Sequence, residues 1–144
     1  MTVHLIKLCV GVEDPETLAE YHRMRLSQKK KAGQPQELMH VTRMTPKRAD
    51  ELLDGGSLYW VMKGVVRCRQ RIVELRPLVD EEGKSHCGLV LDPEIVLTER
   101  LAKRPFQGWR YLETENAPKD ARQVEGEDEM PAEMREELRE LGLL

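Results

Sequence analysis

Basic side chains recur at short intervals in the longest stretch with strand-forming composition, residues 57–77. In an extended strand, successive side chains point to opposite faces of a sheet, so alternate positions share a face. The guanidinium of arginine is a planar fork that binds two phosphate oxygens at once. The spacing therefore predicts a basic strand face that binds nucleic acid, made of Lys63, Arg67, Arg69 and Arg71.

Two tryptophans extend this prediction, because aromatic rings provide stacking surfaces for unpaired bases. Trp60 lies shortly before Lys63, and Trp109 stands directly before Arg110. Aromatic residues make up only 4% of the chain, so each one is a large share of the available stacking surface. The full candidate nucleic-acid-binding set is Trp60, Lys63, Arg67, Arg69, Arg71, Trp109 and Arg110.

The basic strand face and the aromatic segment around Trp109 could each have a structural role instead of binding nucleic acid. The basic face could be solvated, or it could pair with the acidic tail, residues 112–144, which holds 11 acidic and 4 basic residues. The tail has a net charge of −7, against +4 for residues 1–111 and −3 for the whole chain. The second aromatic segment could plug the open end of a barrel, and such packing is our preferred interpretation of Phe106, Trp109 and Leu112.

The spacing of the cysteines and histidines gives little support for a metal site or a Cys–His nucleophile pair. His86 and Cys87 are neighbours, so on a strand they point to opposite faces and do not readily join Cys68 in one metal or nucleophile site. These cysteines are more simply buried apolar residues of a reduced protein. The sequence has no glycine-rich phosphate loop and no Ser-His-Asp order. We therefore expect no metal, no cofactor and no catalytic residue, and enzymatic activity stays open.

The elements that would position these residues fit one domain, because 144 residues suffice for a single core. Capping residues followed by proline predict helices after Asp14 and after Thr45, and an apolar stripe predicts a third over 131–141. Gly64 predicts a bulge or sharp bend that divides the long basic stretch. Short apolar runs between turn signals predict strands over 3–12, 38–44, 57–63, 65–76, 86–91 and 94–99.

Tight turns between short strands favour an α+β fold, with a curved, mostly antiparallel sheet or a small β-barrel flanked by two N-terminal helices and one C-terminal helix. The predicted parts are a domain over 1–112, an acidic, loosely ordered linker over 113–130 and a helix over 131–144 that packs on or near the domain. The sequence shows no signal-peptide pattern and no apolar run long enough to cross a bilayer. We expect a cytoplasmic protein without a membrane partner, and the sequence indicates no oligomeric state.

Three segments, His4 to Val12, Leu58 to Val66 and Pro105 to Leu112, resemble an uncharacterised bacterial family, domain of unknown function 1489. This resemblance spans most of the chain and implies no activity, cofactor or catalytic residue. A strand, a glycine and a second strand with a basic outer face also resemble the PUA-like domains of the ASCH and EVE type. That second resemblance implies a small barrel that binds RNA or modified bases, so RNA is the expected partner.

Two other functions stay open beside RNA binding. A small molecule or nucleotide derivative could bind or react in a cleft near Trp60, Lys63 and Trp109. The charged helices could instead form a protein-interaction module. RNA binding would weaken with salt, whereas a small ligand would raise the melting temperature, because it binds the native state alone.

Overall fold

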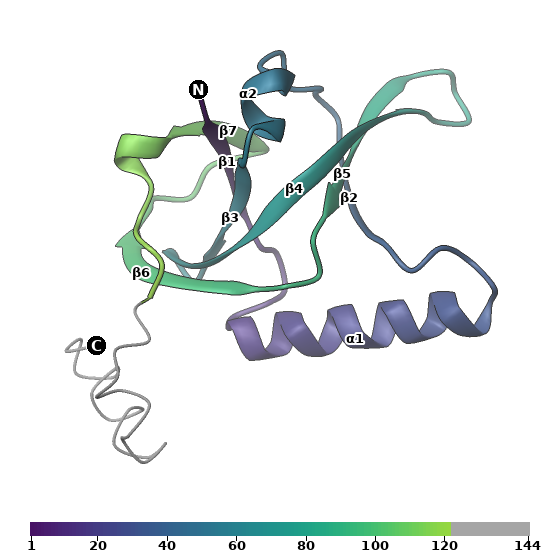
Figure 1. The fold of residues 1–144 in the computed structure, drawn as a ribbon, viewed down its shortest axis with the longest axis horizontal. Helices are drawn as coiled ribbons and strands as arrows, with labels where there is room; N and C mark the ends of the chain where they lie inside the picture. Colours follow the sequence, from purple (N-terminus) through teal and green to yellow (C-terminus); the bar gives the residue numbers. More distant parts are fainter. Residues whose placement is uncertain (122–144) are drawn as a thin grey trace.

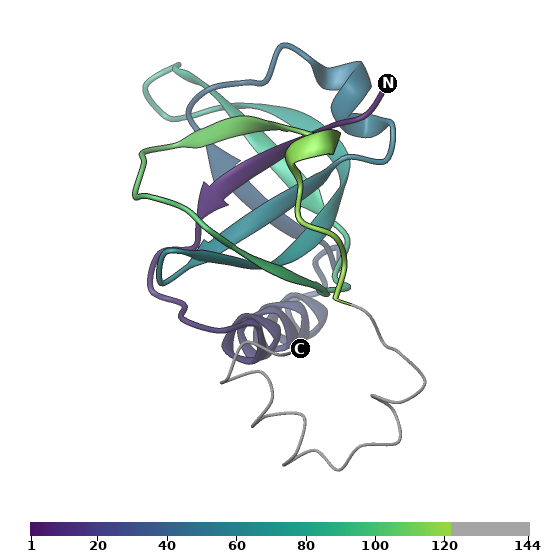
Figure 2. The same ribbon diagram turned by 90° about the vertical axis from the view of Figure 1, so that its left-hand side faces the viewer.

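A curled sheet of seven strands forms the body of the protein, as a computed structural model that describes residues 1–121 shows (Figure 1 and Figure 2). The strands are β1 Val3–Leu8, β2 Leu38–Thr42, β3 Ser57–Met62, β4 Val65–Val79, β5 Ser85–Leu91, β6 Val96–Ala102 and β7 Trp109–Glu113. Their order is β2-β5-β4-β3-β1-β7, and β6 pairs with β4 outside this path. β1 and β3 run parallel, while the other strand pairs are antiparallel.

The predicted curved, mostly antiparallel sheet is confirmed, whereas the small PUA-like barrel is not. Among the described residues no strand pairing joins β2 to β7, so the sheet stays open along this seam. Two side chains of β7 bridge it. The Trp109 Nε1–H donates to the Met44 carbonyl (2.9 Å), and the Tyr111 hydroxyl accepts the backbone N–H groups of Lys47 (2.8 Å) and Arg48 (3.1 Å). Individual side chains therefore replace a strand ladder at the seam.

Two helices, α1 Pro15–Lys31 and α2 Ala49–Leu53, lie at opposite ends of the curled sheet (Figure 1). α1 begins as predicted, because the Asp14 carboxylate accepts the Thr17 N–H (2.7 Å) and proline takes the first helical position. A short 3₁₀ helix, η1 Thr114–Asn116, follows β7. The predicted C-terminal helix lies outside the described residues. No helix within residues 1–121 is long and apolar enough to cross a membrane.

The predicted start of α2 at Thr45 is wrong. Arg48 has a non-helical ψ of 48°, and the helix begins one residue later. The N–H groups of Lys47 and Arg48 donate to Tyr111 on β7, so a tertiary contact replaces the first predicted turn. The predicted end of α2 is confirmed, because Gly55 follows the helix with a φ of 82°, the left-handed value that ends many helices.

The glycine in the basic stretch turns the chain back on itself. Lys63 and Gly64 have φ values of 50° and 75°, the left-handed values of a two-residue hairpin turn between β3 and β4. The predicted sharp bend is therefore confirmed. Lys63 belongs to the turn, so the prediction that it shares a strand face with the three arginines is wrong.

A β-bulge in β4 changes the side-chain pattern beyond this turn. Trp60 pairs with Cys68 and Val61 pairs with Val66, which leaves Arg67 without an opposite residue. Cys68 consequently packs in one apolar cluster, and Val66 packs in another. The predicted single apolar face is wrong at Val66, because simple alternation does not continue across a bulge.

Two apolar clusters pack on the two sides of the sheet. The curl encloses the first, to which both helices contribute, and its buried members are Val3, Leu5, Leu18, Leu52, Leu58, Trp60, Met62, Cys68, Ile72, Cys87, Leu89 and Leu91. The second comprises Ile6, Tyr59, Val61, Val66 and Leu112. Cys68 and Cys87 are at most 1% exposed, which confirms their predicted apolar role.

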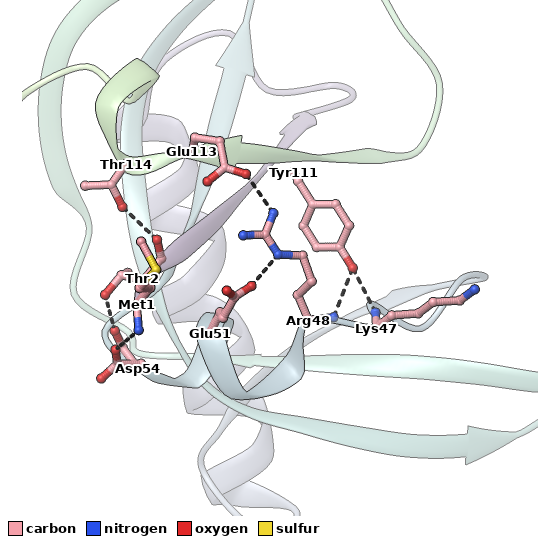
Figure 3. A network of polar contacts seen from close by, with 9 residues as sticks. All are labelled: Met1, Thr2, Lys47, Arg48, Glu51, Asp54, Tyr111, Glu113 and Thr114. Carbon is pink, nitrogen blue, oxygen red and sulfur yellow. Dashed lines mark hydrogen bonds and ion pairs between the residues drawn. The ribbon is translucent and has the colours of Figure 1, made fainter.

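A polar network holds α2 against β7 (Figure 3). The Arg48 guanidinium donates to the carboxylates of Glu51 and Glu113, the latter over 2.7 Å, and lies 5.2 Å from the centre of the Tyr111 ring. These hydrogen bonds raise the pKa of Arg48 and lower the pKa of Glu51. We call these four residues the α2 clasp. Its charges are compensated within the chain.

Candidate functional site

Arg69, in the middle of the predicted basic face, has partners within the chain. Its guanidinium donates two hydrogen bonds to the Asp120 carboxylate (2.7 and 2.8 Å) and one to the Ser57 hydroxyl (2.9 Å). Asp120 belongs to the acidic tail and forms a β-bridge with Thr98 of β6. The pair raises the pKa of Arg69 and lowers the pKa of Asp120. At Arg69 the tail therefore occupies the basic face.

Of the other three cations of the predicted face, two contact Glu13 and the third is exposed. Lys63 forms an ion pair with the Glu13 carboxylate (3.0 Å), and Arg67 donates to the Glu13 carbonyl (3.4 Å). Arg71 is exposed and has no ion-pair partner within residues 1–121. The structure therefore does not bring the four cations into one continuous row.

The second aromatic segment is packed against the protein. Trp109 lies against the first apolar cluster, Leu112 belongs to the second, and Phe106 packs against the second. Arg110 stacks over the Phe106 ring at 4.8 Å from its centre. The preferred interpretation as packing agrees with these contacts, although the three apolar side chains divide between two sides of the sheet.

A different site lies where α1 crosses the end of the sheet. The cleft there has a volume of about 400 Å³, within the range of small-molecule pockets. Of the seven predicted site residues, only Trp60 lines it. We call it the α1 cleft, and its lining comprises Lys7, Leu8, Cys9, Val10, Gly11, Val12, Leu18, Tyr21, His22, Arg25, Leu38, Met39, His40, Trp60 and Leu91.

The α1 cleft is positively charged. Lys7 from β1 and Arg25 from α1 line it, and within residues 1–121 no carboxylate does. Neither cation has an ion-pair partner within residues 1–121, in contrast to Arg48 and Arg69. The strand register places Lys7 between Trp60 of β3 and Trp109 of β7, so the second tryptophan lies one strand beyond the cleft.

A buried glutamine organises the wall of the α1 cleft. Gln70 is 0% exposed, and its Oε1 lies 3.0 Å from both Trp60 Nε1 and His22 Nε2. Its amide nitrogen donates to the Asp92 carbonyl (2.9 Å). An indole N–H can only donate, so the atom facing it is the amide oxygen. That oxygen also requires a proton on Nε2 of His22.

His22 is a neutral base in this wall. Burial lowers its pKa below the ordinary value; the hydrogen bond to Gln70 opposes this in part, and the nearby charge of Arg25 acts in the same direction as burial. A neutral imidazole carries one proton, and Gln70 requires it on Nε2. The Nδ1 lone pair is therefore the acceptor that His22 can offer to a ligand.

His40 on β2 contributes a second neutral imidazole. Its ring meets Trp60 edge to face, with centres 5.2 Å apart, and its Nε2 is buried without a hydrogen-bond partner within residues 1–121. Burial, together with the charges of Lys7 and Arg25, lowers the pKa of His40 to about 4. A buried polar atom without a partner carries a desolvation cost that a ligand could remove.

Cys9 also lines the α1 cleft, but its chemistry is that of a thiol. Burial raises its pKa to about 11, which the charge of Lys7 opposes only in part. At neutral pH the nucleophilic thiolate is therefore scarce. No group of three potential metal ligands occurs within the described part of the chain. The arrangement is suited to binding an anion with an apolar or planar body.

The sequence interpretation missed Lys7, Arg25, His22 and His40 as members of one site. One signal was present, because His22 stands in the apolar row of α1 between Leu18 and Leu26, where a polar residue faces the sheet. Nothing in the sequence indicated that β1, α1 and β2 converge, because they come together only when the sheet curls.

Comparison with known proteins places the chain in one family without assigning an activity. Neither the curated proteins nor the solved structures include a match. A family model described as "Protein of unknown function (DUF1489)" matches residues 5–144. This match covers nearly the whole sequence and agrees with the resemblance of the three segments. The chain therefore belongs to the DUF1489 family.

Proposed function

We propose that the protein binds a small anionic molecule with a planar body, of the nucleotide-derivative class, in the α1 cleft. The observation that carries the proposal is a cleft lined by two cations, Lys7 and Arg25, and by no carboxylate of the described residues. Other cations of the chain, such as Arg48, are compensated by carboxylates. Two unpaired positive charges beside a concave surface favour a negatively charged ligand.

The remaining lining supports a ligand with an apolar or aromatic part. Leu18, Leu38 and Leu91 line the same cleft as the ring of Tyr21, which is 49% exposed. An exposed tyrosine ring offers a face for stacking, and the leucines offer apolar contact. A nucleoside monophosphate combines a planar base with a phosphate and matches both halves of this lining.

A binding experiment with nucleoside monophosphates tests the proposal. Some members of a purine and pyrimidine panel should raise the melting temperature of the full chain. Lys7→Met with Arg25→Met should weaken binding by about 100-fold, because each lost charge-assisted hydrogen bond accounts for about tenfold. The control is Arg23→Met with Lys30→Met, which removes the same charge from exposed positions of α1 that do not line the cleft. A flat panel, or equal weakening by the control pair, contradicts the proposal.

Binding of single-stranded RNA to the basic strand face is the second candidate. Exposed Arg71, which lacks an ion-pair partner within residues 1–121, favours it, whereas the pairing of Arg69 with Asp120 opposes it. Arg67→Glu with Arg71→Glu should then abolish RNA retention, and the binding constant of the wild type should fall with salt. Unchanged retention by this double variant contradicts RNA binding at the strand face.

A further inference from the structure

The hydrogen bonds behind the α1 cleft define what His22 can offer a ligand. Trp60 and His22 both donate to one oxygen of Gln70, and the amide nitrogen of Gln70 is used by Asp92. The amide cannot flip, because the reversed group would point N–H groups at the indole N–H. Gln70 is fully buried, so water does not compete for these bonds. His22 therefore keeps its proton on Nε2.

The Nδ1 atom of His22 is the polar point that this arrangement leaves unused. It has no hydrogen-bond partner within residues 1–121, and His22 lines the cleft. The neighbouring cations of the cleft, Lys7 and Arg25, can only donate hydrogen bonds. Nδ1 of His22 is thus a hydrogen-bond acceptor in a cleft whose charged groups are donors.

We infer that the ligand donates a ring N–H to Nδ1 of His22 while its anionic group binds Lys7 and Arg25. This inference rests on the proposed function and narrows it to nucleotides whose base carries a ring N–H beside a carbonyl group. Uracil and hypoxanthine are bases of this kind. Their carbonyl oxygens can also accept hydrogen bonds from the cations of the cleft, Lys7 and Arg25.

Methylation of the base tests the inference without changing the charge of the ligand. At pH 8, where His22 is neutral, uridine monophosphate should bind the full chain at least about tenfold more tightly than its N3-methyl analogue, since the methyl group removes the donor. In His22→Phe, which keeps a ring but removes the acceptor, the ratio between the two ligands should fall below about threefold. Inosine monophosphate and its N1-methyl analogue provide a second matched pair.

The tautomer can be measured independently of any ligand. A long-range ¹H–¹⁵N spectrum of the histidine rings should show the proton of His22 on Nε2 at pH 8.

The outcomes separate the inference from the proposed function. Equal affinity for the methylated and unmethylated nucleotides, or a proton on Nδ1 of His22, overturns the inference while anion binding stands. Binding of other anions, without binding of uridine monophosphate or inosine monophosphate, also overturns it. If no anion binds the wild type and Lys7→Met changes nothing, the proposed function itself fails.

Discussion

The two ends of the curled sheet differ in whether their cations have carboxylate partners within residues 1–121. In the α2 clasp, the cation Arg48 lies between the carboxylates of Glu51 and Glu113 and over the ring of Tyr111. In the α1 cleft, the cations line a hollow with two neutral imidazoles and, in the described part of the chain, with no carboxylate. The cation of the α2 clasp is compensated by carboxylates within residues 1–121, and the cations of the α1 cleft are not.

This difference separates structural polar groups from groups available to a ligand. A charge that is hydrogen-bonded within the chain holds elements together and has little capacity left for a partner. A cation or a buried nitrogen without a partner contributes little to folding and carries a desolvation cost. The α2 clasp therefore accounts for the docking of α2, while the α1 cleft is better explained by binding.

The largest expected effect comes from Gln70, which supports the wall of the α1 cleft. Gln70→Leu removes the acceptor of two buried donors, so the free energy of unfolding should fall by about 3 kcal/mol. The exposed Gln107 provides the matched control, and Gln107→Leu should stay within about 0.5 kcal/mol of the wild type. Urea unfolding monitored by circular dichroism measures both. A small loss at Gln70 would mean that its hydrogen bonds do not organise the cleft.

The second-largest expected effect is a loss of stability in acid, which is caused by protonation of His40. Its pKa is about 4 in the folded protein against an ordinary value of 6.5, because of burial and the charges of Lys7 and Arg25. The unfolded chain therefore binds the proton more readily, and stability that is complete above pH 6.5 is lost as the pH falls towards 4. After allowance for solvent screening, the loss is about 2 kcal/mol at pH 4.

Unfolding curves of the wild type and His40→Phe between pH 7.5 and pH 4 measure this loss. The variant should lose less stability over that range, since it has no proton to bind at this position. An NMR titration of the His40 ring gives the pKa directly. A value near 6.5 would show that the imidazole is solvated and that the cleft does not lower its pKa.

The smallest expected changes in the free energy of unfolding come from removing one hydroxyl of the α2 clasp and one cation of the α1 cleft. Tyr111→Phe removes the acceptor of two backbone N–H groups and should cost about 1 kcal/mol. Lys7→Met should change the free energy of unfolding by less than about 0.5 kcal/mol, because no carboxylate depends on it within residues 1–121. Thermal unfolding of both variants checks this. A reversed order would contradict the division into a structural end and a binding end.

Local signals in the sequence predicted most elements of the fold. Asp14 and the following proline predicted the start of α1, and Gly64 predicted the break between β3 and β4. These features depend on backbone preferences and on contacts within a few residues, so the sequence is sufficient for them. Thr45 failed as a helix start because Tyr111, far along the chain, binds the backbone at that place.

The candidate site was predicted less well than the fold. Trp60 lines the α1 cleft, but Lys63 and Trp109, which the sequence interpretation grouped with it, do not. Its neighbours there are Lys7 and His40, which lie far from it in the sequence. The basic face was a sound strand pattern. Two features interrupt this face: the bulge at Arg67 and the Asp120 carboxylate, which binds Arg69. The alternation of side chains along a strand predicts neither feature.

The sequence by itself determined an α+β protein with a break between β3 and β4 at Gly64, a capped α1 and buried cysteines, because periodicity and capping act over short distances. Only the tertiary structure decided which charges are compensated. Arg69 meets Asp120 because residues 119–121 pair with β6, and Lys7 meets Arg25 because α1 crosses the end of the sheet. Charge pairing depends on distances of a few ångströms between groups remote in sequence, and those distances exist only once the sheet has curled.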